Sequence, residues 1–427
     1  AQKRVIKEIR ADIIGQRQMN RLVQGDVGSG KTLVALMTML LAVDNGFQAC
    51  LMAPTEILAT QHYETISGMC AKIGLNVRLL TGSTKASQRR QIAESLADGS
   101  LHILVGTHAV IEDKVQFSRL GFVVIDEQHR FGVAQRARLW AKSEIPPHVL
   151  VMTATPIPRT LAMTVYGDLD VSVIDELPPG RKPVSTVLRY DEQRDRVDKA
   201  IESQLKAGRQ VYIVYPLIEE NEKLDLKSAT EGFERISARF PSYKAAFVHG
   251  RMKPSEKDDQ MTRFASGEAS ILVSTTVIEV GVNVPNATTM IIENAERFGL
   301  SQLHQLRGRV GRGADQSYCV LMTKHKIAAE TRKRLEIMTS TNDGFVIAEA
   351  DMQMRGPGDI EGTMQSGLPF ELKIANMARD GQTIQLARGA AEKLLDDDPD
   401  LTSPQNANFA RALALMTDRS TDWSRIS

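Results

Sequence analysis

Two short segments of the chain contain the residue types that hydrolysis of a nucleoside triphosphate requires. The first, Gly25-Asp26-Val27-Gly28-Ser29-Gly30-Lys31-Thr32, fits the phosphate-binding pattern G-x-x-x-x-G-K-[ST]. Its glycines let backbone N–H groups wrap the phosphates at the start of a helix, whose dipole favours negative charge. Lys31 would bring positive charge to the β- and γ-phosphates, and the Thr32 hydroxyl would coordinate Mg²⁺. The segment therefore predicts a nucleotide-binding loop.

The second segment, Asp126-Glu127-Gln128-His129, places two carboxylates directly after the apolar run 122–125. A pair of acids at a strand end would, alone, be interpreted as a solvated turn. Beside a phosphate-binding loop, Asp126 is expected to hold Mg²⁺ through water, and Glu127 to orient and deprotonate the attacking water. His129, which alone would be structural, is assigned a coupling role within this tetrad.

A third segment could supply positive charge to the transition state. In Gln305-Leu306-Arg307-Gly308-Arg309-Val310-Gly311-Arg312, the spacing predicts arginines that share one helix face. Arg309 and Arg312 are the candidates to reach the γ-phosphate from a second domain, because an arginine finger accelerates phosphoryl transfer by about 10³–10⁵. A basic helix face or a nucleic-acid contact remains an equal alternative for this segment alone.

Composition limits the class of protein. The 427 residues suit two to three domains, and 53 basic against 52 acidic residues give a net charge of +1, so any binding of nucleic acid must use local patches. The basic stretch 85–90 is better interpreted as a solvated helix face. Three scattered cysteines form no disulfide or metal-binding pattern. We find no signal peptide or membrane-spanning run, and the chain begins with Ala1, so we expect a fragment of a longer protein.

Short apolar strands alternate with helical stretches along most of the chain, which predicts parallel α/β domains. The expected strands cover 20–24, 49–53, 77–81, 102–106, 121–126 and 148–153, and then 184–190, 210–215, 244–248, 270–274, 288–293 and 317–322. A helix is expected over 33–43, after the phosphate-binding loop. The proline-rich stretch 175–183 suggests a domain boundary. Beyond 325 the chain should be mainly helical, interrupted by a glycine-rich loop at 355–358.

These segments together resemble the helicase motifs of superfamily 2, and several others fit between them. The resemblance implies two RecA-like parallel-sheet helicase domains at 1–178 and 179–342, followed by a mainly helical translocation segment at 343–427. It implies adenine recognition by Gln2 and ribose or arginine contacts by Gly281 and Asn283. The segment Thr153-Ala154-Thr155 resembles helicase motif III. Thr153 and Thr155, together with Gln305, would couple the nucleotide site to the DNA-binding site. The implied DNA contacts are Pro54, Thr55, Thr81, Gly82, Thr107, His108, His249 and Thr275.

The match is closest to the RecG family of branched-DNA translocases. The segments 126–133, 153–160 and 297–313 resemble RecG, and 343–367 resembles the translocation motif that RecG shares with the transcription-repair coupling factor. Within that motif, Arg355 and Gln365 match polar positions that link nucleotide state to movement. The tetrad Asp-Glu-Gln-His and the sequence Arg-Gly-Pro-Gly favour RecG over the coupling factor. Asn283 departs from the family's usual aspartate and puts that contact in doubt.

The resemblance implies an ATP- and Mg²⁺-dependent helicase that translocates on duplex and branched DNA in repair and recombination. We expect a monomer in the bacterial cytoplasm, associated with the nucleoid, with single-strand-binding protein as a candidate partner and no membrane. The family's N-terminal wedge is absent from this sequence, so poor fork specificity is expected. The alternatives are a coupling-factor-type translocase, an RNA-unwinding helicase and a non-motor protein that ATP switches between conformations.

Overall fold

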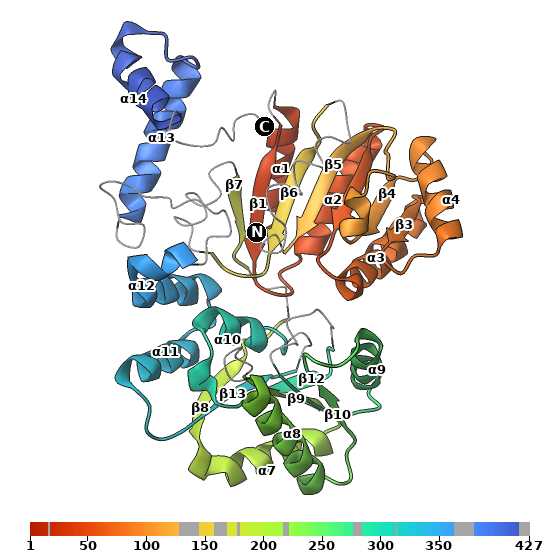
Figure 1. Ribbon diagram of the computed structural model, residues 1–427, viewed down its shortest axis with the longest axis vertical. Coiled ribbons are helices and arrows are strands. Elements are labelled where there is room, and N and C mark those ends of the chain that lie inside the picture. Colours follow the sequence, from red (N-terminus) through yellow and green to blue (C-terminus); the bar gives the residue numbers. More distant parts are fainter. Residues whose placement is uncertain are drawn as a thin grey trace.

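The chain folds around two separate parallel β-sheets (Figure 1). The computed structural model describes residues 1–15, 18–127, 145–157, 169–176, 180–216, 222–275, 284–311, 313, 315–362 and 380–417. The first sheet has seven strands in the order β3-β4-β2-β5-β6-β1-β7, and the second has six in the order β10-β11-β9-β12-β13-β8. Every recorded strand pairing is parallel. These are the two α/β domains that the alternating pattern predicts.

Each expected strand is confirmed to within two residues at its ends. A strand buried on both faces should be an almost continuous apolar run, and β2 is buried at every position. In the first sheet the strands are β1 (Asn20–Gly25), β2 (Gln48–Met52), β3 (Val77–Leu80), β4 (Ile103–Gly106), β5 (Leu120–Asp126), β6 (His148–Thr153) and β7 (Asp170–Ile174). In the second they are β8 (Ser185–Tyr190), β9 (Gln210–Tyr215), β10 (Ala245–Val248), β11 (Ile271–Thr275), β12 (Ala287–Ile292) and β13 (Tyr318–Thr323).

Helices cover both faces of each sheet and continue beyond the second one. The first domain contains α1 (Gln2–Ile14), α2 (Lys31–Asp44), α3 (Glu56–Cys70) and α4 (Ala86–Ala97). The second contains α7 (Arg194–Lys206), α8 (Glu222–Arg239), α9 (Pro254–Ala265), α10 (Leu300–Arg307) and α11 (Ala329–Ser340). After these come α12 (Gly344–Gly362), α13 (Gly381–Asp397) and α14 (Ala407–Thr417). Figure 1 places α12 beside α10 and α11, at the height where the two domains meet, whereas α13 and α14 stand farther to one side.

Four apolar clusters form the core, one on each face of each sheet. In the first domain, Leu22 and Val123 face one cluster, whereas their neighbours Val23 and Val124 face the other. In the second domain the alternating β9 residues Tyr212 and Ile213 divide in the same way. This period of two follows from the strand pleat. Rigid sheets of this kind hold the loops at their carboxyl edges in fixed positions.

Three expectations about local structure were wrong or incomplete. β7 was not predicted, although Asp170-Val171-Ser172-Val173-Ile174 has a recognisable alternation. α10 ends at Arg307, because Gly308 caps it and Gly311 adopts a left-handed φ of 75°, so Arg309 lies beyond the helix rather than on its face. α12 continues through Pro357, where a loop was expected. Proline's φ lies in the helical range, but a proline inside a helix removes one hydrogen bond and crowds the preceding turn, which costs about 3 kcal/mol.

All three cysteines lie within the described residues. Cys50, Cys70 and Cys319 are buried, and none of them forms a disulfide within the described part of the chain. Burial raises the pKa of Cys319 to about 12, so this thiol is unreactive in the folded chain. Within the part of the chain that the structure describes, every helix is too short or too polar to cross a bilayer.

Gly106 provides a test of the strand packing in the first sheet. A Cβ at this position would lie 2.2 Å from the Leu80 carbonyl oxygen on the neighbouring strand, so we predict that Gly106→Ala lowers the free energy of unfolding by about 1–3 kcal/mol. Urea denaturation followed by circular dichroism measures the change. Gly68→Ala is the matched control, because a Cβ there meets nothing within 4 Å and should stabilise α3 by about 0.5–1 kcal/mol. Equal stability of the two variants would contradict this packing.

Candidate nucleotide and nucleic-acid sites

The residues expected to bind and hydrolyse the nucleotide meet at one edge of the first sheet. The phosphate-binding loop follows β1, Asp126 ends β5 and Thr153 ends β6. These three strands are neighbours in the order β5-β6-β1, with Gln24 paired to Thr153 and Asp126 paired to Met152. The carboxyl ends of parallel strands are where α/β sheets bind ligands. Residues about 100 positions apart in the sequence are therefore brought together by strand order alone.

The glycines of the phosphate-binding loop are required by its geometry. Gly28 and Gly30 have left-handed φ values of 80° and 90°. A Cβ on Gly25 would lie 2.6 Å from the Ser29 hydroxyl oxygen, and a Cβ on Gly30 would collide with the Gln2 amide. The buried Ser29 hydroxyl oxygen has no hydrogen-bond partner among the described residues, which suits a loop that receives further polar groups.

Two side chains brace this loop. The Lys31 ammonium donates to the carbonyl oxygens of Gly25 (2.6 Å) and Asp26 (3.0 Å), so it lies over the loop in which phosphates would sit. Gln2 was expected to recognise adenine. Its amide nitrogen donates to the Ser29 carbonyl oxygen at 2.7 Å and ties α1 to the loop. Thr32 lies in the first turn of α2, next to Lys31.

Glu127 connects β5 to the segment that follows β6. Its carboxylate accepts hydrogen bonds from the Ala154 backbone N–H (3.2 Å) and the Thr153 hydroxyl (3.4 Å). The residue has a φ of 53°, a left-handed conformation that costs a side chain such as Glu on the order of 1–2 kcal/mol. Backbone strain of this kind persists where the surroundings hold it, often at functional sites. The carboxylate is thus fixed in direction rather than free to rotate into solvent.

The same path continues into the second domain. The Thr153 hydroxyl oxygen also accepts from the Thr155 backbone N–H at 3.1 Å. The Thr155 hydroxyl oxygen in turn accepts from the Gln305 amide of α10 at 2.7 Å. The expected coupling residues Thr153, Thr155 and Gln305 therefore form a continuous hydrogen-bonded route from Glu127 to the helix that precedes Arg309.

A second contact between domains joins the phosphate-binding loop to α10. The His304 Nε2 lies 2.9 Å from the Asp26 carboxylate, and the Arg307 guanidinium donates to the other ring nitrogen of His304 at 3.1 Å. Arg307 is buried and also donates to the carbonyl oxygens of Met338 and Thr341. Burial alone would raise the pKa of Asp26. The hydrogen bond from His304 and the charges of Lys31 and Arg307 nevertheless hold that pKa below its ordinary value.

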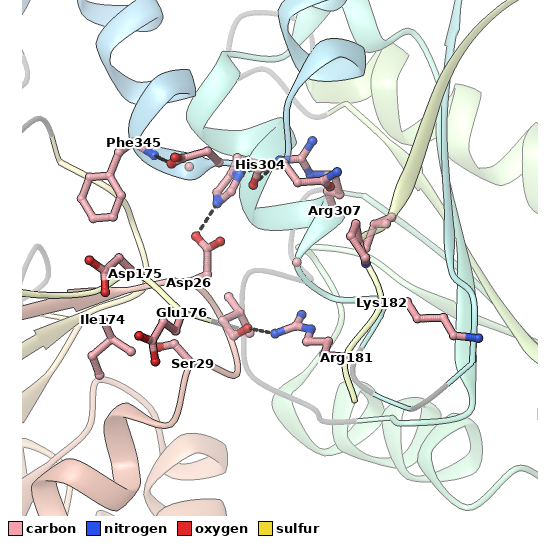
Figure 2. A pocket seen from close by; sticks show the side chains of 17 residues that line it. Asp26, Ser29, Ile174, Asp175, Glu176, Arg181, Lys182, His304, Arg307 and Phe345 are labelled. Carbon is pink, nitrogen blue, oxygen red and sulfur yellow. Dashed lines mark hydrogen bonds and ion pairs between the residues drawn. The ribbon is translucent and has the colours of Figure 1, made fainter. Parts of the chain in front are cut away.

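The connection between the domains contributes a third contact. Arg181 donates to the carbonyl oxygen of Val27 in the phosphate-binding loop (2.5 Å) and to that of Gly311 after α10 (2.6 Å). Figure 2 shows Arg181 and the His304–Asp26 pair on the wall of one cavity of about 240 Å³. The cavity is lined by the phosphate-binding loop, the segments 174–176 and 181–184, α10 and residues 342–345. It lies where both domains meet.

The start of α12 reaches the same junction. Asp343 caps this helix, because its carboxylate accepts from the Phe345 N–H at 2.8 Å. A Cβ on Gly344 would lie 2.4 Å from the Pro156 ring, 2.7 Å from His304 Nε2 and 2.8 Å from the Asp26 carboxylate. Only glycine lets the helix approach so closely. The segment expected to drive translocation therefore begins in contact with the phosphate-binding loop.

The expected DNA contacts of the first domain lie together at the other flank of its sheet. Pro54 and Thr55 follow β2, Thr81 and Gly82 follow β3, and Thr107 and His108 follow β4. These strands are neighbours in the order β3-β4-β2. Strand order therefore makes these short segments into one surface.

The basic residues of the stretch 85–90 differ in their surroundings. Arg89 donates to the carbonyl oxygens of Thr81 (2.7 Å) and Thr84 (3.1 Å) and pairs with Glu112 at 3.1 Å. It holds the loop after β3, whereas Lys85 and Arg90 are exposed. The interpretation as a solvated helix face therefore fits Lys85 and Arg90, but not Arg89.

The second domain repeats this arrangement with His249 and Thr275. His249 follows β10 and Thr275 ends β11, the neighbouring strand. Within the described part of the chain, the buried Thr107 hydroxyl, His249 Nδ1 and Thr275 hydroxyl have no hydrogen-bond partner, although buried polar atoms in folded proteins almost always have one. Burial lowers the pKa of His249, and the charges of Lys257 and Arg251 lower it further. Buried polar atoms without a hydrogen-bond partner among the described residues thus lie at the ends of strands in both sheets.

Several expected site residues lie outside the described residues. These are His129, Gly281, Asn283, Arg312 and Gln365. Arg355 lies in α12, and its backbone alone is described. Arg309 follows the helix end, as stated above.

Sequence reasoning gave no role to three residues that the geometry brings to the site. His304 lies inside the arginine-containing segment, and its position three residues before Arg307 could have suggested a shared helix face. Arg181 was treated only as part of a domain boundary. His62, whose Nε2 lies 2.7 Å from the Asp126 carboxylate, has no local signal in the sequence. Each of the three acts on a partner far along the chain, which motif spacing does not reveal.

Comparison with protein families divides the chain into three parts. Residues 1–164 match the DEAD/DEAH box helicase family, and residues 192–314 match the helicase conserved C-terminal domain. Residues 341–427 match the family described as ATP-dependent DNA helicase RecG, domain 3, C-terminal.

Whole relatives and solved structures agree with these matches. The chain is 55% identical to the ATP-dependent DNA helicase RecG of Synechocystis over 94% of this chain and 48% of the relative, and 51% identical to that of Bacillus subtilis over 95% and 59%. It therefore spans about half the length of the curated relatives that it matches. A structure of RecG bound to a three-way DNA junction superposes with a TM-score of 0.75, at 45% identity, over 90% of this chain and 50% of that chain. Yeast Dbp5 bound to RNA, at 16% identity and a TM-score of 0.58, shares the fold alone.

Thr155→Val tests the route between the domains. The substitution keeps the size of the side chain but removes the acceptor of Gln305, which costs about 0.5–1.5 kcal/mol for a hydrogen bond of this kind. Because α10 would be held less firmly, we predict a several-fold lower kcat for ATP hydrolysis with a KM for ATP within about twofold of that of the unaltered chain. Steady-state kinetics measures both. Thr230→Val is the control, since that hydroxyl donates only within α8; an equal effect of both substitutions would contradict the route.

Proposed function

Because this chain belongs to the RecG family of helicases over the part that it spans, we propose that it is an ATP-driven motor that moves along double-stranded DNA and acts on branched DNA. One observation carries the proposal. The hydrogen-bonded route from Glu127 through Thr153 and Thr155 to Gln305 joins the expected catalytic carboxylate to the second domain. Such a route lets hydrolysis at one sheet change the position of the other.

Residues of both domains supply the chemistry of hydrolysis. Backbone N–H groups of the phosphate-binding loop and Lys31 hold the phosphates of ATP. The Glu127 carboxylate, fixed in direction by Thr153 and Ala154, accepts the proton of the attacking water. Arg309 and Arg312 neutralise the charge that develops on the transferred phosphoryl group. Adenine and ribose would be recognised by Gln2, Gly281 and Asn283.

Mg²⁺ fits the oxygen donors at this site. Mg²⁺ in nucleotide sites is usually held by one or two carboxylates together with phosphate oxygens. Asp126 and the Thr32 hydroxyl are such donors, and the described residues contain no larger cluster of acids, histidines or cysteines that would hold a metal independently of the nucleotide. When bound, the ion would neutralise the β- and γ-phosphate oxygens. Asp126 and Thr32 would orient it.

Closure of the two domains would move DNA. The expected contacts after β2, β3 and β4 belong to the first sheet, and those after β10 and β11 to the second, so a change in the angle between the sheets displaces one set of contacts relative to the other. Contacts to phosphates should dominate, which makes binding independent of sequence and sensitive to salt. Aromatic residues are only 5% of the chain, too few for base stacking to be the main grip.

The alternatives differ in what supports them. A coupling-factor-type translocase would share the motor, but the match of residues 341–427 to the C-terminal domain of RecG supports the RecG assignment. An RNA-unwinding helicase would share only the fold. A non-motor protein switched by ATP would bind the nucleotide without repeated turnover, so kinetics with DNA distinguishes it from a motor.

We further propose the domain limits 1–178, 179–342 and 343–427, to which the separate sheets and the start of α12 lend support. The coupling roles of His129, Arg355 and Gln365 are proposals as well. A monomeric state, single-strand-binding protein as a partner and a place in the bacterial cytoplasm near the nucleoid complete the proposal.

Lys31→Ala and Glu127→Gln test the nucleotide chemistry. Without Lys31 the phosphates lose their main cation, so hydrolysis should be abolished. Without the Glu127 carboxylate, ATP should still bind, but it should not turn over. Steady-state ATP hydrolysis and the binding of a fluorescent ATP analogue measure the two steps. The exposed Lys72→Ala is the control, and turnover within twofold of the unaltered chain would refute the role of the replaced residue.

Arg355→Ala tests the translocation segment. α12 begins against Asp26 and His304, so a change within this helix should affect movement rather than the chemical step. We expect basal ATP hydrolysis to persist while displacement of a third strand from a triplex on duplex DNA falls at least tenfold. Arg388→Ala is the matched control, because Arg388 pairs with Glu392 on α13. Unchanged strand displacement would show that Arg355 has no coupling role.

A further inference from the structure

The contact between His62 and Asp126 assigns a role to a residue that no motif includes. We propose that His62 is a positioning residue, through which the DNA contacts of the first domain act on the carboxylate expected to hold Mg²⁺. The proposal rests on the proposed function, because it takes Asp126 as a metal ligand and the segments after β2 and β3 as DNA contacts. It describes how DNA bound to the first domain would affect the nucleotide site of the same domain.

The contact between His62 and Asp126 is short and sheltered from solvent. The His62 Nε2 lies 2.7 Å from Asp126 Oδ2, and the two side chains are only 11% and 10% exposed. A hydrogen bond to an ionised carboxylate in such a sheltered place is stronger than a neutral one at the surface. Because it engages Oδ2, the bond sets the rotation of the carboxylate and therefore the direction of Oδ1. His62 thus fixes the donor that the metal would meet.

The helix that carries His62 begins next to the expected DNA contact Thr55. α3 begins at Glu56, and the Thr55 hydroxyl oxygen caps it by accepting from the Leu58 N–H at 3.4 Å. At a rise of 1.5 Å per residue, His62 lies about 10 Å along the axis from Thr55. A helix transmits a displacement over this length without needing any intermediate side chain. The expected DNA contact Thr55 and the partner of Asp126 therefore belong to one rigid element.

The same helix also holds a second protein segment that is expected to contact DNA. The Glu56 carboxylate accepts from the Ser83 backbone N–H (3.1 Å) and the Ser83 hydroxyl (2.9 Å). A Cβ on Gly82 would lie 3.0 Å from this carboxylate. The loop with Thr81 and Gly82 is thus bound to the first residue of α3. Force on the contacts after β2 or after β3 reaches the same helix end.

A shift of α3 along its axis would change the His62–Asp126 geometry directly. DNA bound at the start of the helix would then alter how Asp126 presents its oxygen to the metal. This predicts that His62 affects two quantities together: the Mg²⁺ requirement of nucleotide binding and the stimulation of ATP hydrolysis by duplex DNA. If His62 served only in packing, its replacement would not selectively change the Mg²⁺ requirement or the stimulation by duplex DNA.

The test compares His62→Ala, His62→Gln and Thr65→Ala in the 427-residue chain. Gln keeps an N–H donor, whereas Thr65 is exposed on the same helix and donates only to the Gln61 carbonyl oxygen. Binding of a fluorescent ADP analogue is titrated with Mg²⁺, and ATP hydrolysis is measured with and without linear duplex DNA. Circular dichroism establishes that each variant is folded.

For His62→Ala we expect the half-saturating Mg²⁺ concentration to rise at least fivefold and the ratio of DNA-stimulated to basal hydrolysis to fall at least fivefold. His62→Gln should recover at least half of both, and Thr65→Ala should match the unaltered chain. Values for His62→Ala within twofold of those of the unaltered chain would overturn the proposal, as would a changed Mg²⁺ requirement with undiminished stimulation. If duplex DNA fails to stimulate the unaltered chain, the proposed function fails, while the Mg²⁺ titration still decides whether His62 positions Asp126.

Discussion

The direction of the Glu127 carboxylate is the constraint on which the site depends. Its two hydrogen bonds from Thr153 and Ala154 offset the left-handed backbone at Glu127 and keep the carboxylate at the carboxyl end of β6. Because the Thr153 hydroxyl also accepts from Thr155, and Thr155 accepts from Gln305, the same constraint extends to the second domain. A single strained residue thus joins the chemistry to the contact between domains.

The phosphate-binding loop is held from several sides rather than standing free at the end of β1. Gln2 holds it from α1, and His304 contacts it from α10. Arg181 bridges its Val27 carbonyl oxygen to Gly311, and Gly344 brings α12 against Asp26. Groups from both domains and from α12 therefore contact one small loop. A loop held in this way can transmit a change in the bound phosphates to each of these elements at once.

The strands and the nucleotide motifs could be predicted because both are local. Buried parallel strands are short apolar runs, and a phosphate-binding loop is a contiguous pattern. The contacts of His62, Arg181 and His304 could not be predicted, because each partner lies between 64 and 278 positions away. The prediction that a helix extends across Arg309 was wrong, because Gly308 and Gly311 favour a turn more strongly than arginine spacing favours a helix. The glycine-rich stretch 355–358 predicted a loop, although α12 passes through it.

In the proposed mechanism, ATP hydrolysis by this chain is coupled to duplex DNA. Steady-state ATP hydrolysis measured without nucleic acid, and with linear duplex DNA, a fork, single-stranded DNA and RNA, tests it most directly. We expect stimulation by the duplex and by the fork, and this stimulation should decline as salt increases because phosphate contacts dominate. Stimulation by RNA alone, or by none of these nucleic acids, would contradict it.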